Sequence, residues 1–254
     1  MIQSEAYFHA PAEELRQAMK EVRAAAGERL RQLAPQVEAL AGAEPDLLAF
    51  VKAHPTPYLQ PAEKGTPWDL RPTALRGLRL VLALAQGADT LGDDDLRALI
   101  EAVYEHAEYL FCFNVTADLL TRTLSASFLI LSGFSLRAFS VAAQWRLIGM
   151  GRLLSILEPT PSRLEEAGFK AAVRMYRGQL GRGEFRVLED PTHGPLLKKV
   201  IALVGEWARE EDVALIPEWA EYYQEIGGKP LSAVRFVNMR VGDDDAFWQS
   251  LNRR

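Results

Sequence analysis

Apolar residues recur along most of the chain at spacings of three and four, which places them on one face of an α-helix. The first such stretch begins after Pro11 and continues to Leu33, just before Pro35. It predicts an amphipathic helix of about six turns that ends before Pro35, because proline interrupts a helix interior. A shorter helix is predicted over 45–52.

A proline-rich segment interrupts this pattern between His54 and Pro72, where five prolines and Gly65 exclude regular structure. It reads either as a free linker or as a loop fixed to the rest of the protein. We expect a loop pinned by Tyr58 and Trp68, because a free linker rarely carries two large aromatic side chains.

Helical periodicity returns after the prolines. It predicts helices over 73–86, 92–110, 115–131 and 136–157, the last two as an antiparallel pair. The longest apolar run without a charge covers 123–136, which is short of the ~20 residues that a membrane-spanning helix needs. This run predicts a buried core helix followed by a turn at Ser132 and Gly133, and no membrane span.

The last third of the chain combines helical and strand-like patterns. Ser162 and Glu165 form a capping box that predicts a helix to about Leu180. Residues 184–189 and 233–241 alternate or are rich in β-formers, which predicts a small antiparallel ribbon. Two helices are predicted between them, over 195–209 and 217–226.

These elements predict a mainly α fold of stacked antiparallel helix pairs with a small C-terminal β-ribbon. Its parts are an N-terminal helical arm (1–53), the Pro-rich pinned loop (54–72), a helical core (73–182) and an α+β C-terminal portion (183–254). We expect them to form one continuous globular unit.

Composition agrees with a globular helical protein. The chain is 48% hydrophobic, has a small net charge of −5, and is rich in the strong helix formers Ala and Leu. Its single cysteine, Cys112, excludes an internal disulfide, and the N-terminal residues lack a secretory pattern. A cytoplasmic location is therefore the simplest expectation.

The net charge is unevenly distributed. Residues 119–187 contain 10 basic and 4 acidic side chains, while the flanking parts of the chain are acidic. A basic segment in an acidic protein suggests a surface that faces an anion. The alternative is that these arginines pair internally with the acidic flanks.

Local signatures of catalysis and metal binding are missing from the sequence. The four histidines show no paired i, i+3 or i, i+4 spacing, so we expect no metal and no cofactor. Three acidic side chains, Glu101, Glu105 and Glu108, are interpreted as a solvated helix face. Cys112, between two phenylalanines, is expected to be a buried, unreactive thiol.

Two short motifs have structural interpretations. The aspartates Asp93–Asp95 follow Gly92 at a predicted helix start, where carboxylates interact favourably with the helix dipole. Gly149 and Gly151 lie in a helical stretch and indicate close helix packing rather than a phosphate-binding loop.

The clearest candidate for binding lies on the predicted helix after Ser162. Four of its cations lie within about 60° of one another around the helix, at 100° per residue: Arg163, Lys170, Arg174 and Arg177. Arg182 and Arg186 extend this arginine stripe. Such a row suits the phosphates of a nucleic acid or the charges of an acidic sugar. The same row could instead pair with acidic residues of a neighbouring helix.

Three segments also carry a family resemblance. They are 67–72 (PWDLRP) followed by Arg76, 144–146 (QWR), and 173–177 (VRMYR). Their order over residues 67–180 resembles the α-helical toroid of the heparinase II/III-like polysaccharide lyases. The resemblance implies an incomplete α/α toroid and an acidic polysaccharide as the ligand.

The resemblance also implies one catalytic candidate. Tyr176 matches the tyrosine that donates a proton to the leaving sugar oxygen in these lyases. Arg177 stands where the family signature has His, and 120–122 (LTR) stands near its Asn-His pair. No group that would abstract the α-proton in β-elimination is visible.

The sequence therefore predicts a non-enzymatic binding or regulatory protein that contacts an anionic partner, either nucleic acid or an acidic surface, through the arginine stripe. One alternative is a lyase-like protein, active or degenerate, that binds acidic polysaccharide. Another is a structural homo-oligomer joined through apolar helix faces such as that of 15–33.

Overall fold

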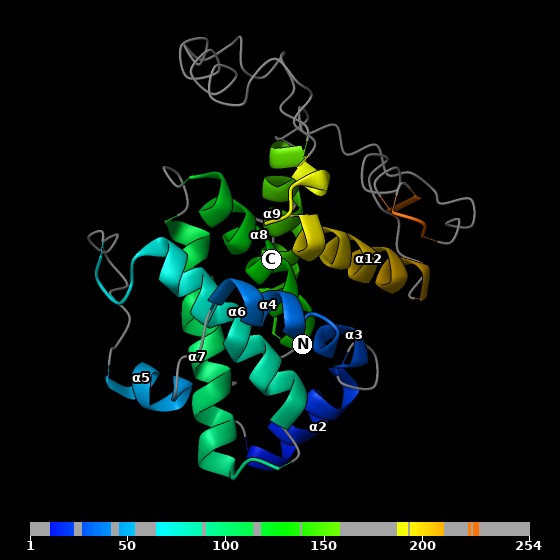
Figure 1. Cartoon of the computed structure of the whole chain (residues 1–254). Helices are drawn as coiled ribbons and strands as arrows, with labels where there is room; N and C mark the ends of the chain where they lie inside the picture. Colours follow the sequence, from blue (N-terminus) through cyan, green and yellow to red (C-terminus); the bar gives the residue numbers. More distant parts are fainter. Residues whose placement is uncertain are drawn as a thin grey trace, which may run out of the picture. The chain divides into compact units, whose positions relative to one another are not determined.

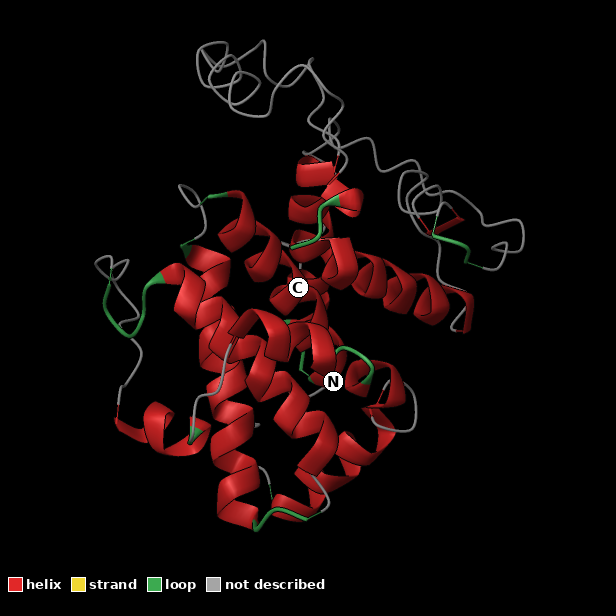
Figure 2. Ribbon diagram, viewed as in Figure 1, coloured by secondary structure: helices red, strands yellow, loops and turns green. Residues whose placement is uncertain are grey.

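The chain is mainly helical, as a computed structural model shows (Figure 1). The structure describes residues 11–22, 27–41, 46–53, 65–87, 90–113, 118–137, 139–157, 187–192, 194–210, 223–224 and 226–228. All regular elements in these ranges are helices and none is a strand (Figure 2). The predicted mainly α class is confirmed.

The described helices follow one another along the chain in the order of their labels. They are α2 (Ala12–Val22), α3 (Glu28–Arg31), α4 (Ala34–Ala41), α5 (Leu47–Ala53), α6 (Leu70–Gly87), α7 (Asp93–Cys112), α8 (Leu119–Ser135), α9 (Ala142–Leu157), the 3₁₀ turn η2 (Val187–Glu189) and α12 (Gly194–Glu210). The chain divides into two compact units, Met1–Val200 and Ile201–Arg254, and α12 crosses their boundary. No described helix is long and apolar enough to cross a bilayer.

Helix α8 is the central element of the first unit. Every residue from Thr123 to Ser135 is buried, and the helix contacts α2, α6, α7 and α9. Its sequence explains this position, because small and apolar side chains occur all round the helix and no charged residue follows Arg122 within it.

Helices α8 and α9 form the predicted antiparallel pair. An added Cβ at Gly149 would lie 2.8 Å from Ile130 Cγ1 and 2.9 Å from the Ala126 carbonyl oxygen. One at Gly133 would lie 2.6 Å from the Ala142 carbonyl oxygen. The end of α8 therefore lies against the start of α9. At both contacts glycine has no side chain, which permits the two helices to approach each other closely.

Close packing accounts for one of the two glycines singled out in the sequence. Gly149 has the predicted role, whereas nothing lies within 4 Å of a Cβ built at Gly151. Gly77 of α6 provides a similar contact on α8, where an added Cβ would lie 2.7 Å from the ring of Phe128.

One predicted helix boundary is wrong. The turn at Ser132 and Gly133 is absent, because α8 continues to Ser135 and the Ser132 hydroxyl donates to the Phe128 carbonyl within the helix at 2.8 Å. The first helical stretch does end before Pro35, at Arg31 of α3, but Pro35 itself lies in the first turn of α4, a helix that the sequence did not predict. Proline is tolerated there because the first N–H groups of a helix have no intrahelical acceptor.

The predicted β-ribbon is not supported where it can be examined. Val187–Glu189, half of the first predicted strand, forms a 3₁₀ turn with Leu188 buried. This corrects the prediction for those residues; 184–186 and 233–241 lie outside the described part of the chain. The helix predicted over 195–209 is confirmed as α12.

In the second unit, the described residues centre on one tyrosine. Tyr223 is buried, and Cβ atoms added at Gly205 or Gly228 would clash with its ring. Its hydroxyl donates to Glu206, which also accepts from Arg209. The ring and its hydroxyl thus fix the 223–228 segment to the end of α12.

Candidate functional site

The arginine stripe lies outside the described residues. Its members are Arg163, Lys170, Arg174, Arg177, Arg182 and Arg186, and Tyr176 lies in the same part of the chain. The described residues before this part end at Leu157, the last residue of α9, and the next described residue is Val187. The stripe remains a prediction from the sequence.

Four arginines of the same basic segment are described, Arg122, Arg137, Arg146 and Arg152, and the last two donate to backbone carbonyls. Arg152 donates to the carbonyl oxygens of Leu110, at 2.9 Å, and Phe111, at 2.7 Å, in the last turn of α7. Burial lowers the pKa of its guanidinium from the ordinary value. Carbonyls at a helix C-terminus lack intrahelical donors, so a cation there is favourable.

Arg146 has the equivalent role on the neighbouring helix. It donates to the Gly133 carbonyl near the end of α8, and its guanidinium carbon lies 5.6 Å from the centroid of the Phe134 ring. Both arginines are half-buried. Part of the positive charge of the basic segment is therefore used inside the first unit, on helix ends.

A buried polar cluster, which the sequence analysis missed, joins α6 to α7. Arg76 is 3% exposed, and its Nε donates to His106 Nε2 at 3.0 Å. His106 Nδ1 lies 2.7 Å from the Ala102 carbonyl oxygen, to which it donates. His106 therefore accepts at Nε2 and donates at Nδ1, which is the pattern of a neutral imidazole.

Aromatic rings enclose this cluster. The Arg76 guanidinium carbon lies 4.1 Å from the centroid of Phe50 and 5.4 Å from that of Trp68. The Trp68 ring lies 4.6 Å from that of His106 and 5.4 Å from that of Tyr109. Cation–π contacts of this kind stabilise a cation that has left water.

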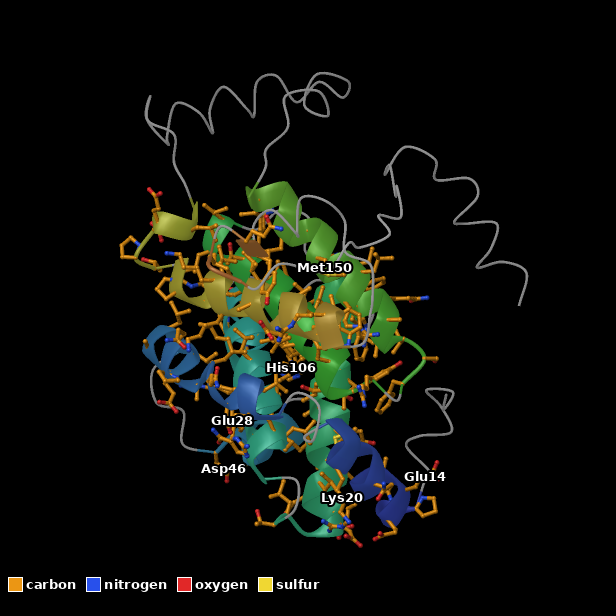
Figure 3. The ribbon with its side chains drawn as sticks, turned by 90° about the vertical axis from the view of Figure 1, so that its right-hand side faces the viewer. Glu14, Lys20, Glu28, Asp46, His106 and Met150 are labelled. Atoms are coloured by element: carbon orange, nitrogen blue, oxygen red, sulfur yellow. The ribbon has the colours of Figure 1, made fainter. Side chains whose placement is uncertain are left out.

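The cluster fixes the end of the Pro-rich loop. Trp68 is buried, and Arg76 donates to the Pro67 carbonyl oxygen at 2.7 Å. The burial of Trp68 agrees with an anchoring role, while Tyr58 lies outside the described residues. His106, against which the Trp68 ring lies, is fully buried in the interior of the protein (Figure 3).

His106 is unsuited to proton transfer near neutral pH. Burial, and then the charge of Arg76, lower its pKa to about 3. Its acceptor nitrogen is occupied by Arg76 and its donor nitrogen by a backbone carbonyl. The arrangement therefore positions the loop and the two helices.

The glutamates of α7 are only partly a solvated face, which corrects the prediction for them. Glu101 is exposed, but Glu105 and Glu108 are half-buried. The Glu108 carboxylate accepts a hydrogen bond at 2.8 Å from Nε1 of Trp145, which is fully buried. An indole N–H that is removed from water needs such an acceptor.

Cys112 is exposed, so the prediction of a buried thiol is wrong. The α7 helix turns its last residue outward, between the half-buried Phe111 and Phe113. Neighbouring protein atoms, and then the Glu108 carboxylate, raise the pKa of the thiol above its ordinary value. The thiolate, which is the reactive form, is correspondingly disfavoured.

The aspartates at the start of α7 occupy its first turn, as predicted. Asp93 accepts from Arg16 Nε at 3.0 Å, and another Arg16 nitrogen donates to the Leu91 carbonyl oxygen at 2.9 Å. Within the described ranges, no group of three or more His, Cys, Asp or Glu side chains could hold a metal ion.

The contacts thus define a helical scaffold in which charged side chains fix loops and helix ends. No family model, curated protein or solved structure matches the chain.

Proposed function

We propose that the protein is a non-enzymatic binding module that holds an anionic macromolecule through the arginine stripe, 163–186. The observation that carries the proposal is the distribution of charge along the chain. Between residues 119 and 187 there are 10 basic and 4 acidic side chains, in a chain whose net charge is −5.

The use of the described arginines supports assigning the binding role to the stripe. Arg146 and Arg152 donate to carbonyls at helix ends and contribute to packing. Of the other eight cations of the segment, six belong to the stripe, and the remaining two are Arg122 and Arg137. Phosphate, sulfate and carboxylate groups are chemically suited to such a row.

A binding panel tests the proposal. The full chain is titrated at low salt into fluorescent single-stranded RNA, duplex DNA and heparin, and binding is measured by anisotropy. We expect binding to at least one polyanion, weakened by roughly tenfold or more in the double variant Arg174→Glu, Arg177→Glu.

A matched control reverses two other charges. Lys20 and Lys198 are exposed on α2 and α12, outside the stripe. The variant Lys20→Glu, Lys198→Glu has the same net charge as the stripe variant, so loss of binding in both would show a general charge effect and contradict the proposal.

The lyase-like alternative has its own readout. Cleavage of an acidic polysaccharide by β-elimination creates an unsaturated sugar that absorbs in the ultraviolet. Formation of this product by the full chain, and its loss in Tyr176→Phe, would replace the binding proposal with an enzymatic one.

A further inference from the structure

The outer face of α9 is exposed and uncharged. Its exposed residues are Ala143, Gln144, Leu147 and Gly151, with the half-buried Met150 beside them (Figure 3). Leu147, 36% exposed, is the large apolar side chain that stands out at the surface of the described residues. Both arginines of the helix instead donate to carbonyls inside the unit.

A helix that faces water normally has charged side chains on its outer side. Removing the exposed part of Leu147 from water is favourable, so a segment that covers this face gains stability. The face therefore suits an apolar, uncharged occupant of similar length.

The chain that follows α9 has the required length and connection. Four residues, 158–161 with two prolines, separate Leu157 from the capping box at Ser162. Connections of this length usually join antiparallel neighbouring helices. The predicted helix over 162–180 and α9 itself, with 16 residues, are both roughly 24–28 Å long.

The pattern of this segment matches the uncharged face. At 100° per residue, four of its apolar residues lie more than about 100° from the centre of the arginine stripe: Leu164, Phe169, Ala172 and Met175. The side of the predicted helix opposite the cations is thus mainly apolar, with Glu165 as its one acidic residue.

We infer that residues 162–180 form a helix that packs antiparallel on the outer face of α9. Its apolar side covers Leu147 and Met150, and the arginine stripe points outward. This inference rests on the proposed function and deepens it, because the docked helix holds the cations in a row that an anionic partner can reach. A second copy of the chain on the same α9 face is the competing occupant.

Hydrogen exchange of the full chain, read by mass spectrometry, tests the inference without any ligand. Peptides from 164–180 are expected to exchange more slowly than the intrinsic rate of an unstructured chain. Leu147→Asp and Met175→Asp, which place a charge on either side of the contact, are each expected to speed this exchange by about tenfold or more. Gln17→Asp, an exposed site on α2, is the control and leaves it unchanged.

The possible results distinguish the two candidate occupants of the α9 face, residues 162–180 and a second copy of the chain. They also distinguish the docking from the proposed function. Intrinsic exchange rates in the wild-type 164–180 peptides, or no response to either charge, would overturn the docking. Protection that rises with protein concentration together with a dimer in light scattering would assign the face to a second copy, and also overturn it. Normal protection without polyanion binding would leave the docking intact and reject the proposed function.

Discussion

At the scale of single residues, the Arg76–His106 contact joins a buried cation to a neutral ring. His106 is fully buried and accepts from Arg76 Nε. No local pattern reveals the pair, because the two residues are thirty positions apart on different helices. The one available signal is that Arg76 shares a face of α6 with the buried Leu80 and Leu84.

The first prediction concerns the pH dependence of stability. The pKa of His106 is about 3 in the folded chain, below the ordinary value of 6.5. Below pH 6.5 the unfolded chain therefore binds a proton at His106 that the folded chain does not. This contribution to stability is complete above pH 6.5 and is lost as the pH falls toward 3, by up to about 1.4 kcal/mol per pH unit.

Urea unfolding of the wild type and of His106→Gln, followed by circular dichroism between pH 7 and 4, isolates this contribution. The carboxylates titrate in both proteins, so the wild type should lose more stability than the variant as the pH falls. Parallel pH profiles would show that the pKa of His106 is not depressed.

The second prediction concerns hydroxyls on α8. Thr123 Oγ1 is buried and has no hydrogen-bond partner within the described structure, whereas Thr121 Oγ1 donates to the Asp118 carboxylate at 2.8 Å. Thr123→Val should change the free energy of unfolding little or raise it by up to about 1 kcal/mol, while Thr121→Val should lower it by about 1 kcal/mol. If thermal and urea unfolding show a marked loss for Thr123→Val, its hydroxyl has a partner.

At the scale of elements, periodicity predicted the long helices well and their boundaries less well. The helices α7, α9 and α12 follow from the spacing of their apolar residues. The predicted stop at Ser132 and Gly133 failed because contact with α9 outweighs the low helix propensity of glycine. Such contacts depend on helices that are distant in sequence, and local patterns do not record them.

The third prediction uses two glycines of α9 as a matched pair. Gly149→Ala places a Cβ within 3 Å of α8 and should destabilise the protein by about 1–3 kcal/mol. Gly151→Ala meets nothing within 4 Å and should stabilise it by roughly 0.5–1 kcal/mol through helix propensity. Equal melting temperatures for the two variants would contradict the packing of α8 on α9.

At the scale of the whole molecule, we propose two separate uses for positive charge: fixing the fold, and binding an anionic partner through the arginine stripe. Some arginines fix helix ends and loops within the first unit, as Arg76, Arg146 and Arg152 do. The sequence revealed the excess of charge but not this division, because the carbonyls that accept from Arg146 and Arg152 belong to other helices.

The fourth prediction tests that division. Arg152→Met removes the hydrogen bonds to the end of α7 and should lower the free energy of unfolding by about 1–3 kcal/mol. Polyanion affinity, measured well below the melting temperature, should stay close to that of the wild type, because the Arg152 guanidinium is bonded to carbonyls inside the first unit. A large loss of affinity without a loss of stability would place Arg152 in the binding surface.

The salt dependence of polyanion binding tests the central claim most directly. If all six cations of the stripe contact phosphates of duplex DNA, the logarithm of the binding constant should fall with that of the salt concentration with a slope of roughly −5. Arg174→Glu, Arg177→Glu should make the slope shallower by about 2, and Lys20→Glu, Lys198→Glu should leave it unchanged. A slope that is the same in the wild type and the stripe variant would contradict the claim that these arginines hold an anionic partner.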